Sequence, residues 1–297
     1  MTKPNRSFSL LLTISLSACS VPLTASLPKQ SLESRDTVEI RLQAKTNPEQ
    51  GVNKITPSIM EKAKFVIEQR INSLGLSGVS VFVSANNQLV IQIPNLKDLT
   101  QAKRVIGTTA QLDFRKQKKG TENELRARMQ IYQAATIERE TLKTSNDKKA
   151  IDDNEAEYRK SVEALKGIFE RTGLTGNMVK DAGVSQMGNG SNAWQIALAF
   201  DDRGGDLFAN ITGELGGTGR ALGFFLDDKL ISSPSVGLEF QGKGITGGRA
   251  VITGNFTLET SNELASQIRS GALPVPFEIV EIIDCRKSQI QKSDRCK

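Results

Sequence analysis

Residues 246–281 of the 297-residue chain read TGGRAVITGNFTLETSNELASQIRSGALPVPFEIVE and carry the elements that decide the fold. Within this stretch, residues 249–253 predict a strand, residues 257–270 a helix and residues 276–282 a second strand. Residues 89–114 show the same order of strand, turn, acid-capped helix and strand, which indicates a diverged internal repeat. We therefore expect the two ends of the chain to form one base subdomain, with the middle of the chain inserted into it.

The predicted base begins with a strand and a helix. Residues 38–42, VEIRL, alternate apolar and polar side chains, as a half-buried strand does. Thr56 and Pro57 have the residue types of a helix N-cap and first helical position, and Gly75 is suited to end the helix. Between them runs one apolar stripe at helical spacing, made of Ile59, Ala63, Val66, Ile67, Ile71 and Leu74.

Two strands, a second helix and a closing strand complete this part of the base. The strands are residues 79–83 and 89–93, and the turn between them holds two asparagines, which tolerate positive backbone angles. The helix begins at Asp98 and runs to residue 106, and residues 110–114 predict the closing strand. The order strand, helix, strand, strand, helix, strand is that of a ferredoxin-like unit.

The inserted middle of the chain predicts an α+β head subdomain that carries a charged helical hairpin. Residues 122–172 hold sparse apolar stripes at helical spacing among charges of both signs, which predicts two amphipathic helices. Strands are expected at residues 195–200, 221–226 and 229–231. The hairpin has two interpretations: it packs on its own head, or it is a docking arm for a partner.

The residue types exclude most enzyme chemistry. The chain has no His, which removes the commonest general base and transition-metal ligand, so we expect no enzymatic activity, no metal and no cofactor. The acid pairs Asp201-Asp202 and Asp227-Asp228 lie where a helix cap and a turn are expected, which favours structural roles. Residues 237–244 resemble a phosphate-binding loop, but Gly244 stands where a Ser or Thr is required.

The N-terminal residues predict export from the cytoplasm. Residues 1–18 combine Lys3 and Arg6 with a short apolar run, which is typical of a signal peptide. The sequence Leu-Ser-Ala-Cys that ends at Cys19 resembles a lipoprotein processing box, so we expect a lipid on Cys19 and a flexible tether over residues 19–35. An ordinary cleaved signal with a chance cysteine is the alternative.

The remaining cysteines bear on a disulfide, and the charge distribution bears on nucleic-acid binding. Cys285 and Cys296 could form a disulfide within the charged tail, residues 284–297. The formal net charge is +6, but Lys and Arg are interspersed with acids and aromatic residues make up only 5% of the chain. This pattern argues against nucleic-acid binding.

Five stretches together resemble the extracytoplasmic first domain of the protein-export subunit SecD. The most extensive resemblance lies in residues 246–281, where the glycines, the helix and the ALPVP ending follow the family order. The other four are EKAKFVIEQRINSLG at residues 61–75, residues 89–114 with QIPNLKD and IGTTAQLDFR, LTG at residues 174–176 followed by residues 179–184, and FFLDDKLISSP at residues 224–234.

The resemblance implies a discontinuous base, here residues 36–115 and 245–283, and a head, residues 116–244, that swings relative to the base and holds emerging polypeptide. It implies Sec translocon subunits and unfolded exported polypeptides as partners. The family's Asp-Leu-x-Gly-Gly signature is replaced by VEIRL at residues 38–42. Because no apolar stretch after residue 30 approaches spanning length, we expect an accessory factor without proton-conducting helices, lipid-anchored at the extracytoplasmic face of a bacterial membrane.

Two sets of residues are the candidates for function. Phe224, Phe225 and Leu230 of a head hairpin, with Phe240, are candidate polypeptide contacts, and core packing is the alternative for each. A glycine cluster where the chain is expected to re-enter the base predicts a hinge, formed by Gly242, Gly244, Gly247 and Gly248. The alternative function is an envelope interaction or assembly lipoprotein that uses the same fold without the export role.

Overall fold

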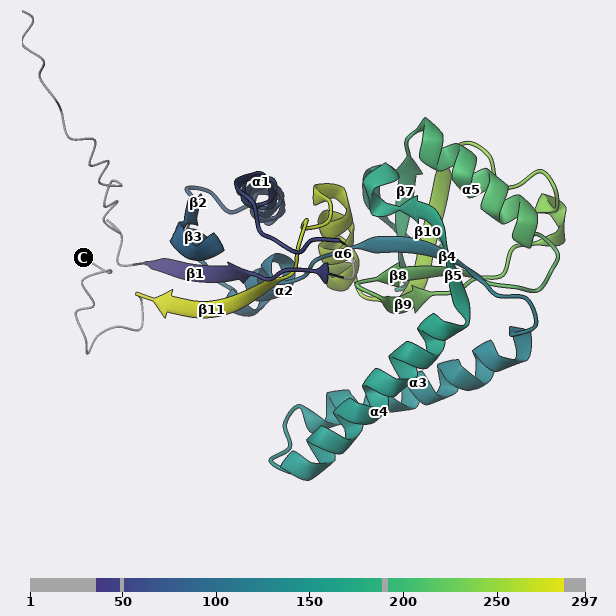
Figure 1. Ribbon diagram of the computed structural model, residues 1–297, viewed down its shortest axis with the longest axis horizontal. Coiled ribbons are helices and arrows are strands. Elements are labelled where there is room, and N and C mark those ends of the chain that lie inside the picture. The colour runs from purple at the N-terminus through teal and green to yellow at the C-terminus, as the bar shows by residue number, and fades with distance from the viewer. Residues whose placement is uncertain (1–35, 49–50, 189–191, 286–297) are drawn as a thin grey trace, which may run out of the picture.

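The computed structural model describes residues 36–48, 51–188 and 192–285. The predicted signal peptide, Cys19, the tether and Cys296 lie outside these residues. The described chain forms two α+β lobes and a helical hairpin (Figure 1).

The base lobe is one antiparallel sheet with two helices, built from both ends of the chain. Its strand order is β11-β1-β3-β2, and β1 pairs with β11 and with β3. Its elements are β1 (Thr37–Ala44), α1 (Pro57–Ser73), β2 (Ser80–Ser84), a 3-10 turn η2 (Ala85–Asn87), β3 (Gln88–Pro94), α2 (Leu99–Ile106) and β11 (Phe277–Asp284). One face of the sheet and the apolar stripe of α1 share a core that contains Ile40, Ile91 and Ile67.

Local signals set the ends of the base elements. Thr56 caps α1 by accepting a hydrogen bond from the Ile59 N–H at 3.3 Å, and Asp98 caps α2 by accepting one from Gln101 at 2.9 Å. Asn86 and Asn87 have φ angles of 60° and 58°, as the predicted turn requires.

The head lobe contains two sheets and two helices around a second core. Its sheets have the orders β10-β7-β6 and β5-β4-β8-β9. Its elements are β4 (Leu112–Gln117), β5 (Phe169–Thr175), η3 (Gly176–Met178), β6 (Val179–Gln186), β7 (Trp194–Phe200), α5 (Asp202–Leu215), β8 (Leu222–Leu226), β9 (Lys229–Ser232), η4 (Leu238–Phe240), β10 (Arg249–Phe256) and α6 (Leu258–Ser270). Phe114, Phe200 and Phe224 stack edge-to-face at the centre of this core.

Two strands expected in the base belong to the head. The predicted strand at residues 249–253 lies in β10, which pairs with β7, and the predicted closing strand at residues 110–114 lies largely in β4, which pairs with β5 and β8. The strand predicted at residues 276–282 does lie in the base, as β11, whereas the helix predicted at residues 257–270, α6, packs on the head core. The assignment from the internal repeat was wrong for β10 and β4, because a strand pattern specifies which face is buried and not which sheet supplies the neighbour.

The hairpin consists of α3 (Glu122–Leu142) and α4 (Lys148–Gly167), which extend away from both lobes (Figure 1). Tyr132 and Tyr158 pack against each other at 5.7 Å between ring centroids, and burial raises the pKa of Tyr132 to about 12. At its root, Leu165 joins Phe169, Phe225 and Leu230 in a third apolar cluster. The root of the hairpin therefore packs on its own head. The outer parts of both helices are exposed.

Candidate functional site

Three of the four predicted polypeptide contacts are buried, Phe224 in the head core and Phe225 and Leu230 in the apolar cluster at the root of the hairpin. Phe224, Phe225 and Leu230 are 2%, 0% and 5% exposed, and Phe225 packs edge-to-face on Phe169. Phe240 is half-buried against the head core. In this structure the first three side chains stabilise the lobe and offer no surface to a polypeptide, as the core-packing alternative requires.

The four glycines expected to form a hinge belong to the head lobe and do not lie where the chain passes between the lobes. They follow η4 and precede β10, both of which belong to the head. Gly244 has a φ of 69°, and a Cβ there would overlap the carbonyl oxygen of Ala209 in α5. Gly242 donates a hydrogen bond to the Gly213 carbonyl at 3.0 Å. Gly244 and Gly248 allow the chain to lie directly on α5, so the predicted hinge residues lie within the head and not at a connection between the lobes.

The chain crosses between the lobes at two other segments. Residues 107–111 connect α2 to β4, and residues 271–276 connect α6 to β11. The two segments are joined by a backbone hydrogen bond from the Leu273 N–H to the Thr109 carbonyl, 2.9 Å long. We refer to these two segments as the crossing strands.

Arg70 of α1 holds both crossing strands. Its guanidinium donates to the carbonyls of Thr108 and Thr109 on one strand, the latter at 3.0 Å, and to the Gly271 carbonyl on the other at 3.1 Å. It also donates to the Val105 carbonyl at the end of α2, 3.1 Å away. The side chain is fully buried, and burial lowers its pKa to about 10, against the opposing effect of the Asp227 carboxylate.

Sequence reasoning missed Arg70, although a signal was present. Residue 70 lies three residues after Ile67 and four after Val66, within the apolar stripe of α1. A charged residue at a core-facing position needs buried partners. Here those partners are carbonyls of the crossing strands, which only the tertiary structure brings to α1.

The turn between β8 and β9 supports the same junction. Asp227 and Asp228 have φ angles of 48° and 65°, which confirms their turn role. The Asp227 carboxylate accepts hydrogen bonds from the N–H groups of Ala110 and Gln111, at 3.1 and 2.9 Å. The head thus fixes the first crossing strand from one side while Arg70 fixes it from the other. The other acid pair is also structural, since Asp201 caps α5 through the Gly204 N–H at 2.7 Å.

Helix α6 contacts the base through polar side chains. Arg104 of α2 forms ion pairs of 2.8 Å with Glu259 and Glu263, and Ser73 of α1 hydrogen-bonds to Ser266. The apolar side of α6 faces the head core instead. The contact between the lobes is therefore mainly polar along this helix.

A groove runs beside α6 where the lobes meet, and we call it the interlobe groove. It has a volume of about 620 Å³ and combines the apolar side chains of Leu74, Val184 and Leu258 with the charged side chains of Glu259 and Arg269. Leu258 is 47% exposed. Strand β6, which supplies Val184, is the edge strand of its sheet. An exposed apolar side chain beside a sheet edge is suited to contact an extended peptide.

In the described part of the chain, no group of three or more His, Cys, Asp or Glu side chains is placed to hold a metal ion. Cys285 is buried at the end of β11 and is disulfide-bonded. Because Cys296 lies outside the described residues, its pairing with Cys285 stays a prediction, as does the lipid on Cys19.

Comparison with known proteins assigns both lobes to one family. Residues 60–119 match the family model described as "Protein translocase subunit SecDF, P1 domain, N-terminal", and residues 153–275 match "SecDF, P1 head subdomain". The chain contains a SecD P1 domain. The SecD head match extends to residue 275 and so includes β10 and α6, in agreement with their place in the structure.

Individual relatives support the SecD assignment. Protein translocase subunit SecD of Synechocystis sp. is 44% identical over 245 residues, which cover 81% of this chain and 52% of the relative. SecD of Prochlorococcus marinus is 34% identical over 305 residues, covering 93% of this chain and 60% of the relative. The chain thus spans between half and two thirds of these SecD proteins.

Solved structures show the same fold. A chain described as "a membrane component SecDF that enhances protein export" matches with a TM-score of 0.59 and 27% identity, over 82% of this chain and 98% of that chain. A SecDF crystal structure in a "Super-membrane-facing form" matches with a TM-score of 0.60 and 27% identity, over 83% of this chain and 30% of that chain. Among the described residues, no helix combines the length and the apolar character needed to cross a bilayer.

Proposed function

We propose that this chain takes part in protein export at the extracytoplasmic face of a membrane, where it contacts translocating polypeptide or the translocon. The observation that carries the proposal is the SecD P1 match across both lobes. The SecD relatives are named protein translocase subunits, and a solved SecDF is described as enhancing protein export. An accessory role beside other translocon subunits fits this evidence.

We propose the interlobe groove as the surface that contacts polypeptide. It lies between base and head, so a chain bound there touches both lobes. Its exposed Leu258 offers apolar contact, and the charged side chains along its sides keep the surface soluble when empty. Unfolded polypeptides expose apolar side chains and unpaired backbone groups. The groove offers apolar contacts for the side chains, and it lies beside β6, the edge strand of its sheet.

Site-specific photocrosslinking tests this proposal. A photoreactive amino acid at position 258 is compared with the same amino acid at position 280, because Leu258 and Val280 are 47% and 48% exposed and Val280 lies on β11 of the base, away from the groove. We expect crosslinks from position 258 to an exported chain arrested in transit, and few from position 280.

The identity of the crosslinked protein separates the two functions. Exported polypeptides or translocon subunits support the export role. Equal crosslinking from both positions, or adducts only with an unrelated envelope protein, would overturn it and favour the alternative of an envelope-assembly module.

We further propose that a lipid on Cys19 holds the chain at the membrane. The support is the sequence Leu-Ser-Ala-Cys after an apolar run. Several acyl chains anchor a protein stably because each buried methylene contributes about 0.8 kcal/mol. The variant Cys19→Ala should leave the membrane fraction or stay unprocessed. Retention of a processed Cys19→Ala chain at the membrane would contradict the anchor.

A further inference from the structure

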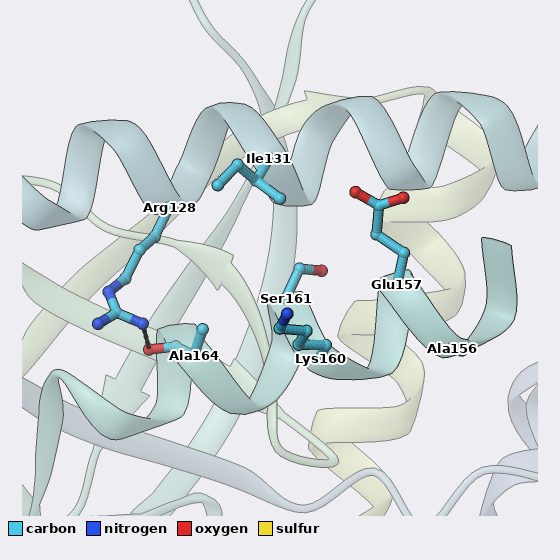
Figure 2. Close-up of a pocket in the computed structure, with 7 residues that line it drawn as sticks. All are labelled: Arg128, Ile131, Ala156, Glu157, Lys160, Ser161 and Ala164. Carbon is cyan, nitrogen blue, oxygen red and sulfur yellow. Dashed lines mark hydrogen bonds between the residues drawn. The ribbon is translucent and has the colours of Figure 1, made fainter. Parts of the chain in front are cut away.

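The exposed part of the hairpin carries a second groove, separate from the interlobe groove. It has a volume of about 610 Å³ and lies between α3 and α4 (Figure 2). The Ile131 side chain from α3 and the Glu157 side chain from α4 project toward the space between the helices. Residues 120–152, which include all of α3, lie between the two family matches, so neither family model describes this surface as a whole.

The groove has the shape of a helix-packing surface. The α4 side is lined by the small residues Ala156, Ser161 and Ala164, which allow another helix to approach closely. Ile131 is 53% exposed beside them. A protruding side chain next to a row of small ones is the arrangement of a knob and a hole, and one copy of the hairpin presents both.

The charges in the groove are of both signs. Arg128 is already engaged, since it pairs with Glu124 at 2.8 Å and donates to the Ala164 carbonyl at 3.1 Å. Glu157 and Lys160 are exposed, and neither makes an ion pair or a side-chain hydrogen bond within the described residues. An acidic ligand would satisfy only Lys160, and a basic ligand only Glu157.

A second copy of α4 satisfies both charges at once. If two α4 helices pack antiparallel about a two-fold axis between residues 158 and 159, Glu157 of each copy faces Lys160 of the other. The same axis brings Ala156 of one copy to the level of Ser161 of the other, so small residues flank the charged pairs on α4. A surface that is complementary to itself after a half turn is the signature of an isologous interface.

We infer that the hairpin groove is a self-association surface, through which two copies of this chain pair by antiparallel α4 packing with reciprocal Glu157–Lys160 ion pairs. The inference is independent of the proposed export role, because it uses no residue of the interlobe groove. In the proposed pair, the exposed apolar side chain of Ile131 becomes buried against the groove of the second copy.

Charge reversal in the full-length chain tests the pairing. Glu157→Lys alone places like charges opposite each other twice, and so does Lys160→Glu alone. We expect each variant to weaken self-association at least about tenfold in sedimentation equilibrium of the full chain in detergent. The double variant restores opposite charges at both positions and should associate as the original chain does.

Mixing the two single variants tests most directly whether residues 157 and 160 face each other in the pair. A chain with Lys at 157 and 160 and a chain with Glu at both positions are complementary, so an equal mixture should form heterodimers that co-purify through a tag on one variant. Matched controls are Asp152→Lys and Arg159→Glu, which reverse exposed α4 charges that do not line the groove. These controls should leave association unchanged.

Two substitutions of exposed isoleucines test the contribution of the Ile131 side chain. Ile131→Asp should abolish association, whereas Ile137→Asp, at a residue that is 69% exposed and outside the groove, should not. A full chain that stays monomeric at all accessible concentrations would overturn the inference. So would dimers that the single reversals leave intact, or dimers that the mixture of variants fails to restore. Because the interlobe groove is unchanged in every variant, failure here leaves the crosslinking test of export unaffected.

Discussion

The joint between base and head and the joint between head and hairpin each contain a buried arginine, but the two arginines have different partners. At the first joint, Arg70 donates mainly to backbone carbonyls. At the second, Arg115 pairs with the carboxylates of Asp113, at 2.8 Å, and Asp228, and its guanidinium lies 4.3 Å from the Phe225 ring centroid.

The hydrogen-bond and ion-pair partners of each arginine determine the direction in which its pKa shifts. Burial lowers the pKa of Arg70 to about 10, because neutral carbonyls compensate little of the lost hydration. Burial also acts to lower the pKa of Arg115, but Asp228 and Asp113 outweigh it, so the pKa is raised. The buried part of the base–head joint therefore depends on hydrogen bonds of Arg70 and Asp227 with backbone groups. The head–hairpin joint depends on charge and on an apolar cluster.

The turn between β8 and β9 serves both joints with adjacent residues. Asp227 accepts from the first crossing strand, whereas Asp228 pairs with Arg115 and, at 3.4 Å, with Lys166 of α4. Movement of the head relative to the base must therefore disturb Arg70 or Asp227, and the hairpin can stay attached to the head while this happens.

The largest effect is expected from Arg70→Met. Removing the guanidinium leaves several buried carbonyls without a donor, and we expect the free energy of unfolding to fall by about 3–5 kcal/mol. Urea unfolding followed by circular dichroism measures the change. Arg126→Met, at an exposed position of α3, is the matched control and should change stability by less than about 0.5 kcal/mol. A similar effect for both variants would show that Arg70 does not hold the crossing strands.

A smaller and pH-dependent effect is expected from Asp228→Asn. Burial raises the pKa of Asp228, but Arg115, Lys166 and Arg171 outweigh it and hold the pKa below its ordinary value of 3.8. A lowered carboxyl pKa contributes stability that is present above the unfolded value and lost as the pH falls through the folded value. Near pH 7 we expect the variant to lose about 1–2 kcal/mol, a figure reduced because Asp228 is partly exposed.

Unfolding of the two proteins at several pH values tests this prediction. The difference between the original chain and Asp228→Asn should be constant from pH 7 to about pH 5 and should shrink as the pH falls below about 4. A difference that stays constant down to the lowest pH at which both proteins fold would contradict the role of the charge.

Asp227→Asn should act locally on the base–head joint. An amide retains one acceptor oxygen, so one of the N–H groups of Ala110 and Gln111 loses its partner, at a cost of about 1 kcal/mol. Hydrogen exchange should show about fivefold less protection at these two amides, with the amides of α3 and α4 unchanged. Equal loss of protection in the hairpin would mean that the two joints open together.

The smallest effect is expected from Arg104→Gln, which removes exposed ion pairs between α2 and α6. Hydrogen bonding to Glu263 raises the pKa of Arg104, but the site is largely exposed. We expect a loss of about 0.2–1 kcal/mol that disappears at high salt. A double-mutant cycle with Glu263→Gln isolates the pair, and a coupling energy insensitive to salt would disagree with this account.

The amino-acid sequence by itself predicted the elements whose signals are local. The Thr56 cap, the Asp98 cap, the asparagine turn and the acidic turn at Asp227-Asp228 each depend on residues within a few positions of one another. The α+β class and the pairing of the two chain ends also followed from the pattern, since β1 pairs with β11. These features are set by short-range hydrogen bonding and by the period of the apolar residues.

Only the tertiary structure decided which sheet each strand joins and where the lobes connect. β10 and β4 have the strand pattern expected of the base, yet their apolar faces complete the head core. The glycines at 242–248 fit against α5, and the buried Phe224, Phe225 and Leu230 fill the head, because long-range packing selects among partners that a local pattern cannot distinguish. Arg70 is a charged residue within the apolar stripe of α1. Its carbonyl partners on the crossing strands come within hydrogen-bonding distance only when both lobes have folded around it.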